Sequence, residues 1–160
     1  MRFYQLNNYV VYHVYAVAEY IILSQIYGKA FNNRYIKNAY TLSAIGICSF
    51  AIINAAFLQS IQTPNSNITS PSFIVWILSA VCLFFYTLQS INYQHLEKSS
   101  LFWFNIGVLI YFSGSFILIA FGGRFLPTSL TEHLSIWKLH VFFNFLHYLT
   151  FNIALWMKEK

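Results

Sequence analysis

Five stretches of mostly apolar residues follow one another along the chain, separated by shorter polar segments. Each is close to the roughly 20 residues that a helix needs to cross the hydrocarbon core of a bilayer. A membrane β-barrel would instead show strands of about ten residues in which polar and apolar positions alternate, and no such alternation is seen here. The pattern predicts an all-α transmembrane bundle of five helices, forming a single domain over residues 1–160, with spans at 9–27, 40–60, 71–90, 101–123 and 139–157.

Residues that favour turns separate the predicted spans. The segment 63–67, with the sequence TPNSN, is typical of a turn between the second and third spans. We expect Pro71 to lie in the first turn of the third helix, where a missing N–H group costs no hydrogen bond. Gly122 and Gly123 are expected to close the fourth helix, with Pro127 shortly after them.

The composition supports a membrane protein over a soluble one. Hydrophobic residues make up 58% of the 160 residues and charged residues only 8%, and the mean hydropathy is +0.57. A soluble domain carries about 25% charged residues, and a disordered chain is far less apolar. Cys48 and Cys82 lie inside apolar runs, so we expect no disulfide framework. The basic residues are scattered near the ends of segments, which fits anchoring in a bilayer better than binding to nucleic acid.

The distribution of Lys and Arg predicts the orientation of the bundle. Cytoplasmic loops of membrane proteins carry an excess of these residues. With five spans, the side that bears Lys29, Arg34, Lys37, Lys98, Lys158 and Lys160 is richer than the side that bears Arg2, Arg124 and Lys138. We therefore expect the N-terminus outside, the C-terminus in the cytoplasm and a multi-pass location in an inner membrane.

Ionisable and polar residues inside the spans are the natural candidates for a site, because burying a charge in a bilayer costs on the order of 3 kcal/mol. Glu19 lies near the middle of the first span, on the same helical face as Tyr12 and Tyr15, and either tyrosine could donate a hydrogen bond to its carboxyl group. His13 interrupts the same span nearer the outer side.

A second group of polar residues follows the fifth span. His140, Asn144 and His147 are spaced so that all three fall within an arc of about 60°, and we expect this stripe to face the bundle interior. In the fourth span, Gly107, Tyr111, Gly114 and Ser115 share a face on which small residues allow a close helix approach. The predicted ligand-binding or polar pocket therefore comprises Tyr12, His13, Tyr15, Glu19, Tyr111, Ser115, His140, Asn144 and His147.

These polar residues are open to several interpretations. They could join helices by hydrogen bonds, or line a ligand-sensing or proton-responsive pocket. If the first and fifth helices are neighbours, Glu19 can pair with His147, as in a small proton-coupled transporter. His13 can likewise pair with His140 and hold haem or a metal ion, as in a redox subunit. Neither a metal-binding motif nor a catalytic motif occurs, so we assign no metal ligand and no catalytic residue, and leave the cofactor unknown.

Three short sequence segments resemble segments of known proteins. They are HVY followed by EY at 13–20, FWFN leading to LIYFSG at 102–114, and the last span with Trp137, His140, Asn144 and the triplet 154–156. They resemble poorly characterised bacterial multi-spanning proteins and the membrane input domain of some sensor histidine kinases. The resemblance implies a non-catalytic, sensor-like module of the bacterial inner membrane. Its expected partners are the lipid bilayer and either another membrane protein or a small apolar ligand.

Overall fold

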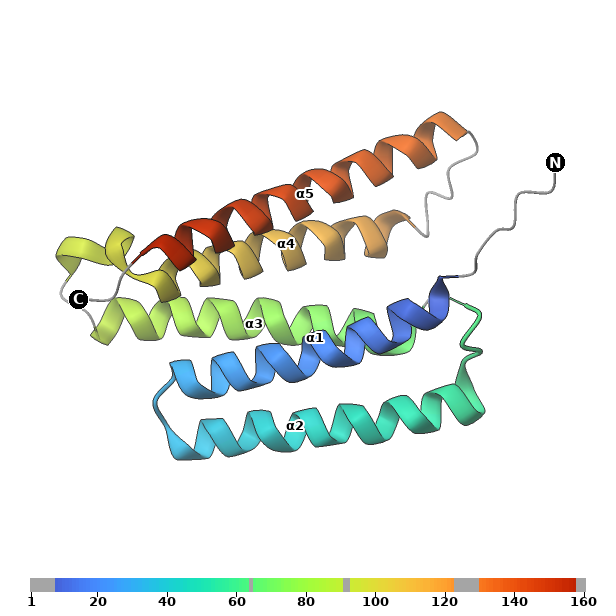
Figure 1. The fold of residues 1–160 in the computed structure, drawn as a ribbon, viewed down its shortest axis with the longest axis horizontal. Coiled ribbons are helices and arrows are strands. Elements are labelled where there is room, and N and C mark those ends of the chain that lie inside the picture. The colour runs from blue at the N-terminus through green and yellow to red at the C-terminus, as the bar shows by residue number, and fades with distance from the viewer. Residues whose placement is uncertain (1–7, 64, 91–92, 123–129, 158–160) are drawn as a thin grey trace. The chain divides into compact units, whose positions relative to one another are not determined.

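The computed structural model describes residues 8–63, 65–90, 93–122 and 130–157 (Figure 1). In these ranges the chain is helical and contains no strand, which confirms the all-α prediction and the number of five α-helices. A π-helical turn η1 (Asn54–Leu58) continues α2, and a 3₁₀ helix η2 (Tyr93–Lys98) precedes α4. The α-helices are α1 (Tyr9–Ala30), α2 (Arg34–Ile53), α3 (Ser66–Ser90), α4 (Ser100–Gly122) and α5 (Leu130–Trp156).

Within the described residues, three helical segments are long and apolar enough to cross a membrane. They are Arg34–Leu58, Ser66–Gln89 and Ser100–Leu118. The membrane character of the chain is therefore supported by α2, α3 and α4. That α1 and α5 also cross the membrane stays a prediction, because polar residues of the candidate site interrupt the apolar sequence of both helices. The orientation of the bundle also stays a prediction, and four of its basic residues, Arg2, Arg124, Lys158 and Lys160, lie outside the described residues.

The chain divides into two compact units, Met1–Ser72 and Phe73–Lys160, and each is described by itself. In the first unit, α1 and α2 form a helical hairpin. The connection needs only three residues because Asn32 adopts a left-handed φ of 47°, which asparagine tolerates better than most residues. The Asn33 side chain then caps α2 by accepting hydrogen bonds from the backbone N–H groups of Tyr35 (2.8 Å) and Ile36 (3.4 Å).

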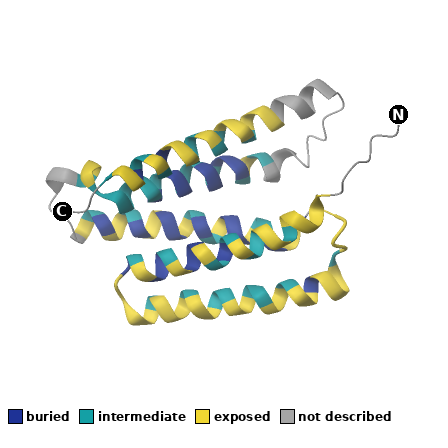
Figure 2. Cartoon of the chain, in the orientation of Figure 1, coloured by how far each residue is buried: buried dark blue, intermediate teal, exposed yellow. Residues whose placement is uncertain are grey.

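Aromatic packing closes this hairpin next to the turn. The rings of Tyr27 and Tyr40 stack with their centroids 6.1 Å apart, and Phe31 stacks on Tyr40 at 6.3 Å. Buried residues recur along α1, whereas none of the residues of α2 is buried (Figure 2). An apolar helix with no buried residue is what a lipid-facing helix requires.

In the second unit, α4 packs between the remainder of α3 and α5. The Asn105 side chain is buried and donates a hydrogen bond to the Ala80 carbonyl oxygen of α3 (2.8 Å). Phe112 meets the edge of Phe73 at a centroid distance of 5.0 Å. The other face of α4 lies against α5, where the predicted polar stripe is found.

Several helices begin before the predicted membrane spans, and the predicted place of Pro71 was wrong. α2 begins at Arg34 and α5 at Leu130, six and nine residues before the predicted spans. α3 begins at Ser66, so Pro71 lies inside this helix and not in its first turn. The physical reason is the same in each case: apolar content marks the membrane-embedded part of a helix, whereas the cap marks its start. α4 ends at Gly122 as expected, and Gly123 and Pro127 lie outside the described residues.

We expect the Asn33→Ala variant to lose about 1 kcal/mol of unfolding free energy, because two backbone N–H groups at the start of α2 lose their acceptor. Unfolding in mixed micelles, followed by circular dichroism, measures the change. Asn38→Ala, at an exposed position inside α2, is the matched control and should change stability by less than about 0.5 kcal/mol. Equal effects of the two substitutions would contradict the capping role.

Candidate functional site

A cluster of histidine and aromatic rings joins α4 to α5. His147 Nδ1 lies 3.0 Å from the Gly107 carbonyl oxygen, and since a carbonyl can only accept, Nδ1 is the donor. The Tyr111 ring lies beside both histidines, at centroid distances of 4.8 Å from His147 and 5.9 Å from His140. Ser115 completes the cluster, because its hydroxyl oxygen lies 3.3 Å from His140 Nδ1. Four of the predicted site residues therefore meet at one helix–helix interface.

Two glycines make this close approach of the helices feasible. A Cβ atom on Gly114 would lie 2.6 Å from the ring of Phe143, and one on Gly107 would collide with the Thr150 hydroxyl and lie 3.2 Å from the Phe151 ring. The expectation that small residues on this face of α4 allow close packing is confirmed at both positions. Asn144 lies half-buried on α5, between the two histidines in sequence.

The arrangement in the second unit is that of a helix-joining interface. Each histidine has a polar partner on α4, and the rings of Tyr111 and Phe151 cover His147 on two sides, at 4.8 and 4.0 Å. Hydrogen bonds of this kind between membrane helices average about 0.6 kcal/mol each. Within the described side chains, no group of three or more His, Cys, Asp and Glu residues is placed to hold a metal ion.

The predicted site residues of α1 lie in the first unit. The Tyr15 hydroxyl donates a hydrogen bond to a carboxylate oxygen of Glu19 (3.1 Å), as its spacing predicts. His13 Nε2 donates to the Thr63 carbonyl oxygen (3.1 Å). Tyr12 and Tyr15 are both more than half exposed, whereas Glu19 is half-buried. The pairs Glu19–His147 and His13–His140, and a pocket shared by the first, fourth and fifth helices, would join the two units and stay predictions.

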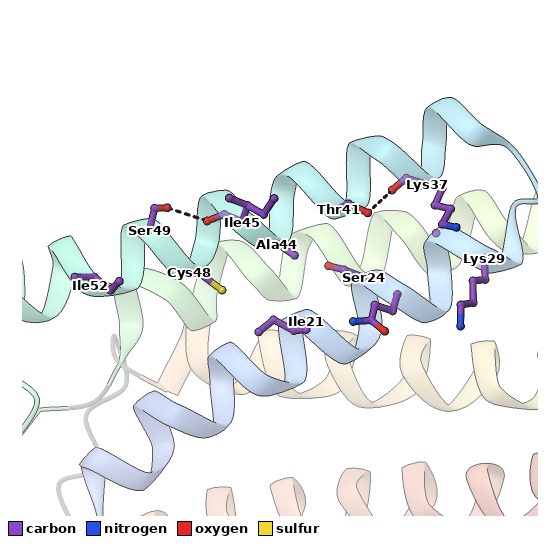
Figure 3. Close-up of a pocket in the computed structure, with 12 residues that line it drawn as sticks. Ile21, Ser24, Lys29, Lys37, Thr41, Ala44, Ile45, Cys48, Ser49 and Ile52 are labelled. Atoms are coloured by element: carbon purple, nitrogen blue, oxygen red, sulfur yellow. Dashed lines mark hydrogen bonds between the residues drawn. The ribbon is translucent and has the colours of Figure 1, made fainter.

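A groove of about 540 Å³ lies between α1 and α2, within the first unit (Figure 3). Its middle is apolar, and Lys29 and Lys37 lie together at one end, with Ile52 at the other. The groove is lined by Ile21, Ser24, Gln25, Gly28, Lys29, Lys37, Thr41, Ala44, Ile45, Cys48, Ser49 and Ile52. None of these residues is acidic, so the groove has an apolar middle and a positively charged end.

The hydroxyl groups that line the groove differ in how they are satisfied. Thr41 and Ser49 donate to backbone carbonyls of their own helix, at 2.9 and 3.0 Å. Ser24 is only 2% exposed, and its hydroxyl has no hydrogen-bond partner among the described residues. A buried hydroxyl without a partner costs on the order of 1–3 kcal/mol, so among the three hydroxyl groups Ser24 is the one left unsatisfied.

The sequence interpretation missed this groove. It ranked positions by the cost of burying an ionisable group, and the groove residues are apolar, small or near helix ends. One feature of the sequence did indicate the groove, namely the two lysines that flank the turn between the first two helices. These lysines were used only to predict the orientation of the bundle. No protein-family model, curated protein or solved structure matches this chain.

The glycine contacts predict that Gly114→Leu weakens the packing of α4 on α5. The added side chain meets the Phe143 ring, and overpacking of this kind costs about 1–3 kcal/mol of unfolding free energy. Gly46→Leu is the matched control, because no atom lies within 4 Å of the position its Cβ would take. Thermal unfolding in detergent measures both variants, and a Gly114→Leu protein as stable as the Gly46→Leu protein would contradict the contact.

The Ser115–His140 contact predicts an energetic coupling between the two side chains. In a double-mutant cycle of Ser115→Ala and His140→Phe, we expect a coupling of about 0.6 kcal/mol in unfolding free energy. A parallel cycle of Ser115→Ala with Tyr148→Phe, at an exposed ring of α5, should show additive effects. Additivity in the first cycle would show that the hydroxyl and the imidazole do not interact.

Proposed function

We propose that this chain is a non-catalytic membrane protein that binds a small apolar or amphiphilic ligand in the groove between α1 and α2. The observation that carries this proposal is the groove itself, about 540 Å³ in volume and mostly apolar, with a few polar groups at defined positions. Ligand sites in proteins have this size and this mixed lining. A hydrophobic occupant would enter from the bilayer, because α2 has no buried residue and its apolar surface is open.

The second unit offers less free bonding capacity for a ligand. Its two histidines use one ring nitrogen each to contact α4, and the aromatic rings around them fill the interface. This arrangement supports a role in holding α4 and α5 together. The ligand-binding role therefore falls to the first unit, where the Ser24 hydroxyl has no partner among the described residues and the two lysines are exposed.

The location and topology belong to the same proposal. We infer a multi-pass protein of a bacterial inner membrane, with its N-terminus outside. In that orientation, the turn between α1 and α2 and its three basic residues, Lys29, Arg34 and Lys37, face the cytoplasm. The resemblance to membrane input domains of sensor kinases supports a sensing role, in which groove occupancy is the sensed quantity.

A groove-filling substitution tests the binding function. We expect the protein extracted in mild detergent to retain a non-covalent adduct of lipid-like mass, seen by native mass spectrometry. Ala44→Trp should lower its occupancy at least about fivefold, because the indole takes up part of the groove of about 540 Å³ and narrows it. Leu42→Trp, at a position of α2 that is 68% exposed and does not line the groove, should retain it. Absence of any adduct on the wild-type chain, or full occupancy in Ala44→Trp, would refute the proposal.

A further inference from the structure

We propose that the occupant of the α1–α2 groove is an anionic phospholipid, with its phosphate held by Lys29 and Lys37 and one acyl chain lying along the groove past Cys48. This inference rests on the ligand-binding function proposed above and names the chemistry of the ligand.

The charge of the groove selects an anion. Lys29 lies in the last turn of α1 and Lys37 in the first turns of α2, and the three-residue turn brings them to the same end of the groove (Figure 3). No acidic side chain lines the groove to neutralise them. Basic pockets between membrane helices on the cytoplasmic side are typical binding sites for anionic lipid headgroups.

The length of the groove selects a lipid over a soluble phosphate compound. Ile52, at the far end of the groove, lies about 22 Å beyond Lys37 along α2, and Cys48 lies about 16 Å beyond Lys37, at about 1.5 Å per residue. The groove therefore continues past the hydrocarbon depth of one leaflet, about 15 Å, and that depth corresponds to the stretch between Lys37 and Cys48. The lining between the two positions includes Ala44 and Ile45, so an acyl chain with its headgroup on the lysines would lie against apolar surface as far as Cys48.

The unpaired hydroxyl of Ser24 lies where a lipid carries its ester carbonyl. Ser24 is one helical turn deeper than Gly28, a step of about 6 Å, and Gly28 lies level with Lys37, since a Cβ on Gly28 would be 3.4 Å from Lys37 Cα. In a phospholipid, the ester carbonyls follow the phosphate toward the acyl chains. The Ser24 oxygen is enclosed by protein atoms in the structure, so its side chain has to turn toward the groove before a lipid carbonyl at this depth can accept its hydrogen bond.

The test compares lipid selectivity in nanodiscs that contain phosphatidylcholine with a minority of phosphatidylglycerol. The full chain is extracted in mild detergent, and native mass spectrometry gives the ratio of the two bound lipids relative to their ratio in the bilayer. We expect an enrichment of phosphatidylglycerol of about tenfold for the wild type, and none for the Lys29→Gln/Lys37→Gln double variant. Arg34→Gln is the matched control, because Arg34 carries the same charge beside the same turn but does not line the groove.

A second measurement reports on the acyl chain. In a Cys82→Ser background, Cys48 is the remaining thiol, and it lines the groove. Long-chain phosphatidylglycerol should slow the alkylation of Cys48 by maleimide, whereas dihexanoyl phosphatidylglycerol and inorganic phosphate should not. Equal protection by inorganic phosphate would overturn the lipid assignment.

The outcomes separate this inference from the function on which it rests. Equal loss of selectivity in Arg34→Gln and in the lysine double variant would show a diffuse surface charge and overturn the headgroup site. If both lipids bind equally and Ala44→Trp removes both, the anionic assignment fails and the binding function stands. If neither lipid binds the wild type, both fail.

Discussion

A polar side chain in an apolar environment is stabilised by a hydrogen-bond partner within the protein, and such bonds are found in each unit of the chain. In the second unit, His147 bonds to the Gly107 carbonyl and Asn105 to the Ala80 carbonyl, so each polar residue fastens one helix to the next. In the first unit, Tyr15 bonds to Glu19 one turn away. In water, a polar group that lost one of these partners would hydrogen-bond to solvent instead. In a bilayer, the same group would be left without a hydrogen bond.

The hydrogen bonds between α4 and α5 depend in turn on the glycines. A carbonyl oxygen of one helix comes within 3.0 Å of a side chain on the next only when the two backbones lie close. Gly107 contributes both the accepting carbonyl and the missing Cβ, and Gly114 leaves room for the Phe143 ring one heptad further on. The polar stripe of α5 and the small-residue face of α4 therefore act together. The close approach of the two helices makes the His147–Gly107 hydrogen bond possible, and that bond offsets the free-energy cost of placing the histidine at the interface.

Some features of the structure could be predicted from the sequence because they follow from apolar content and helical spacing. These features are the helix type, the number of helices, and the shared face of Gly107, Tyr111, Gly114 and Ser115. Helix starts such as Asn33 depend on local capping bonds that hydropathy does not register. The pairing of Ser115 with His140 needed the rotation of two helices about their axes, which a single sequence does not specify. The groove was missed for a different reason: most residues that line it are apolar or small, and its shape depends on the close helix approach at Gly28 and on the short turn at Asn32, which no ionisable side chain marks.

The residues around the groove also indicate how ligand binding can affect the stability of the α1–α2 hairpin. In the groove, two cations and the Ser24 hydroxyl lie beside a helix with no buried residue of its own. The contacts that hold α2 to α1 include the aromatic stack at Tyr27 and Tyr40 and the close approach at Gly28, both near the turn. An occupant that fills the groove adds contacts to both helices further from that turn. By mass action, any ligand that binds the groove of the folded hairpin stabilises the α1–α2 packing, and tighter packing favours binding in turn.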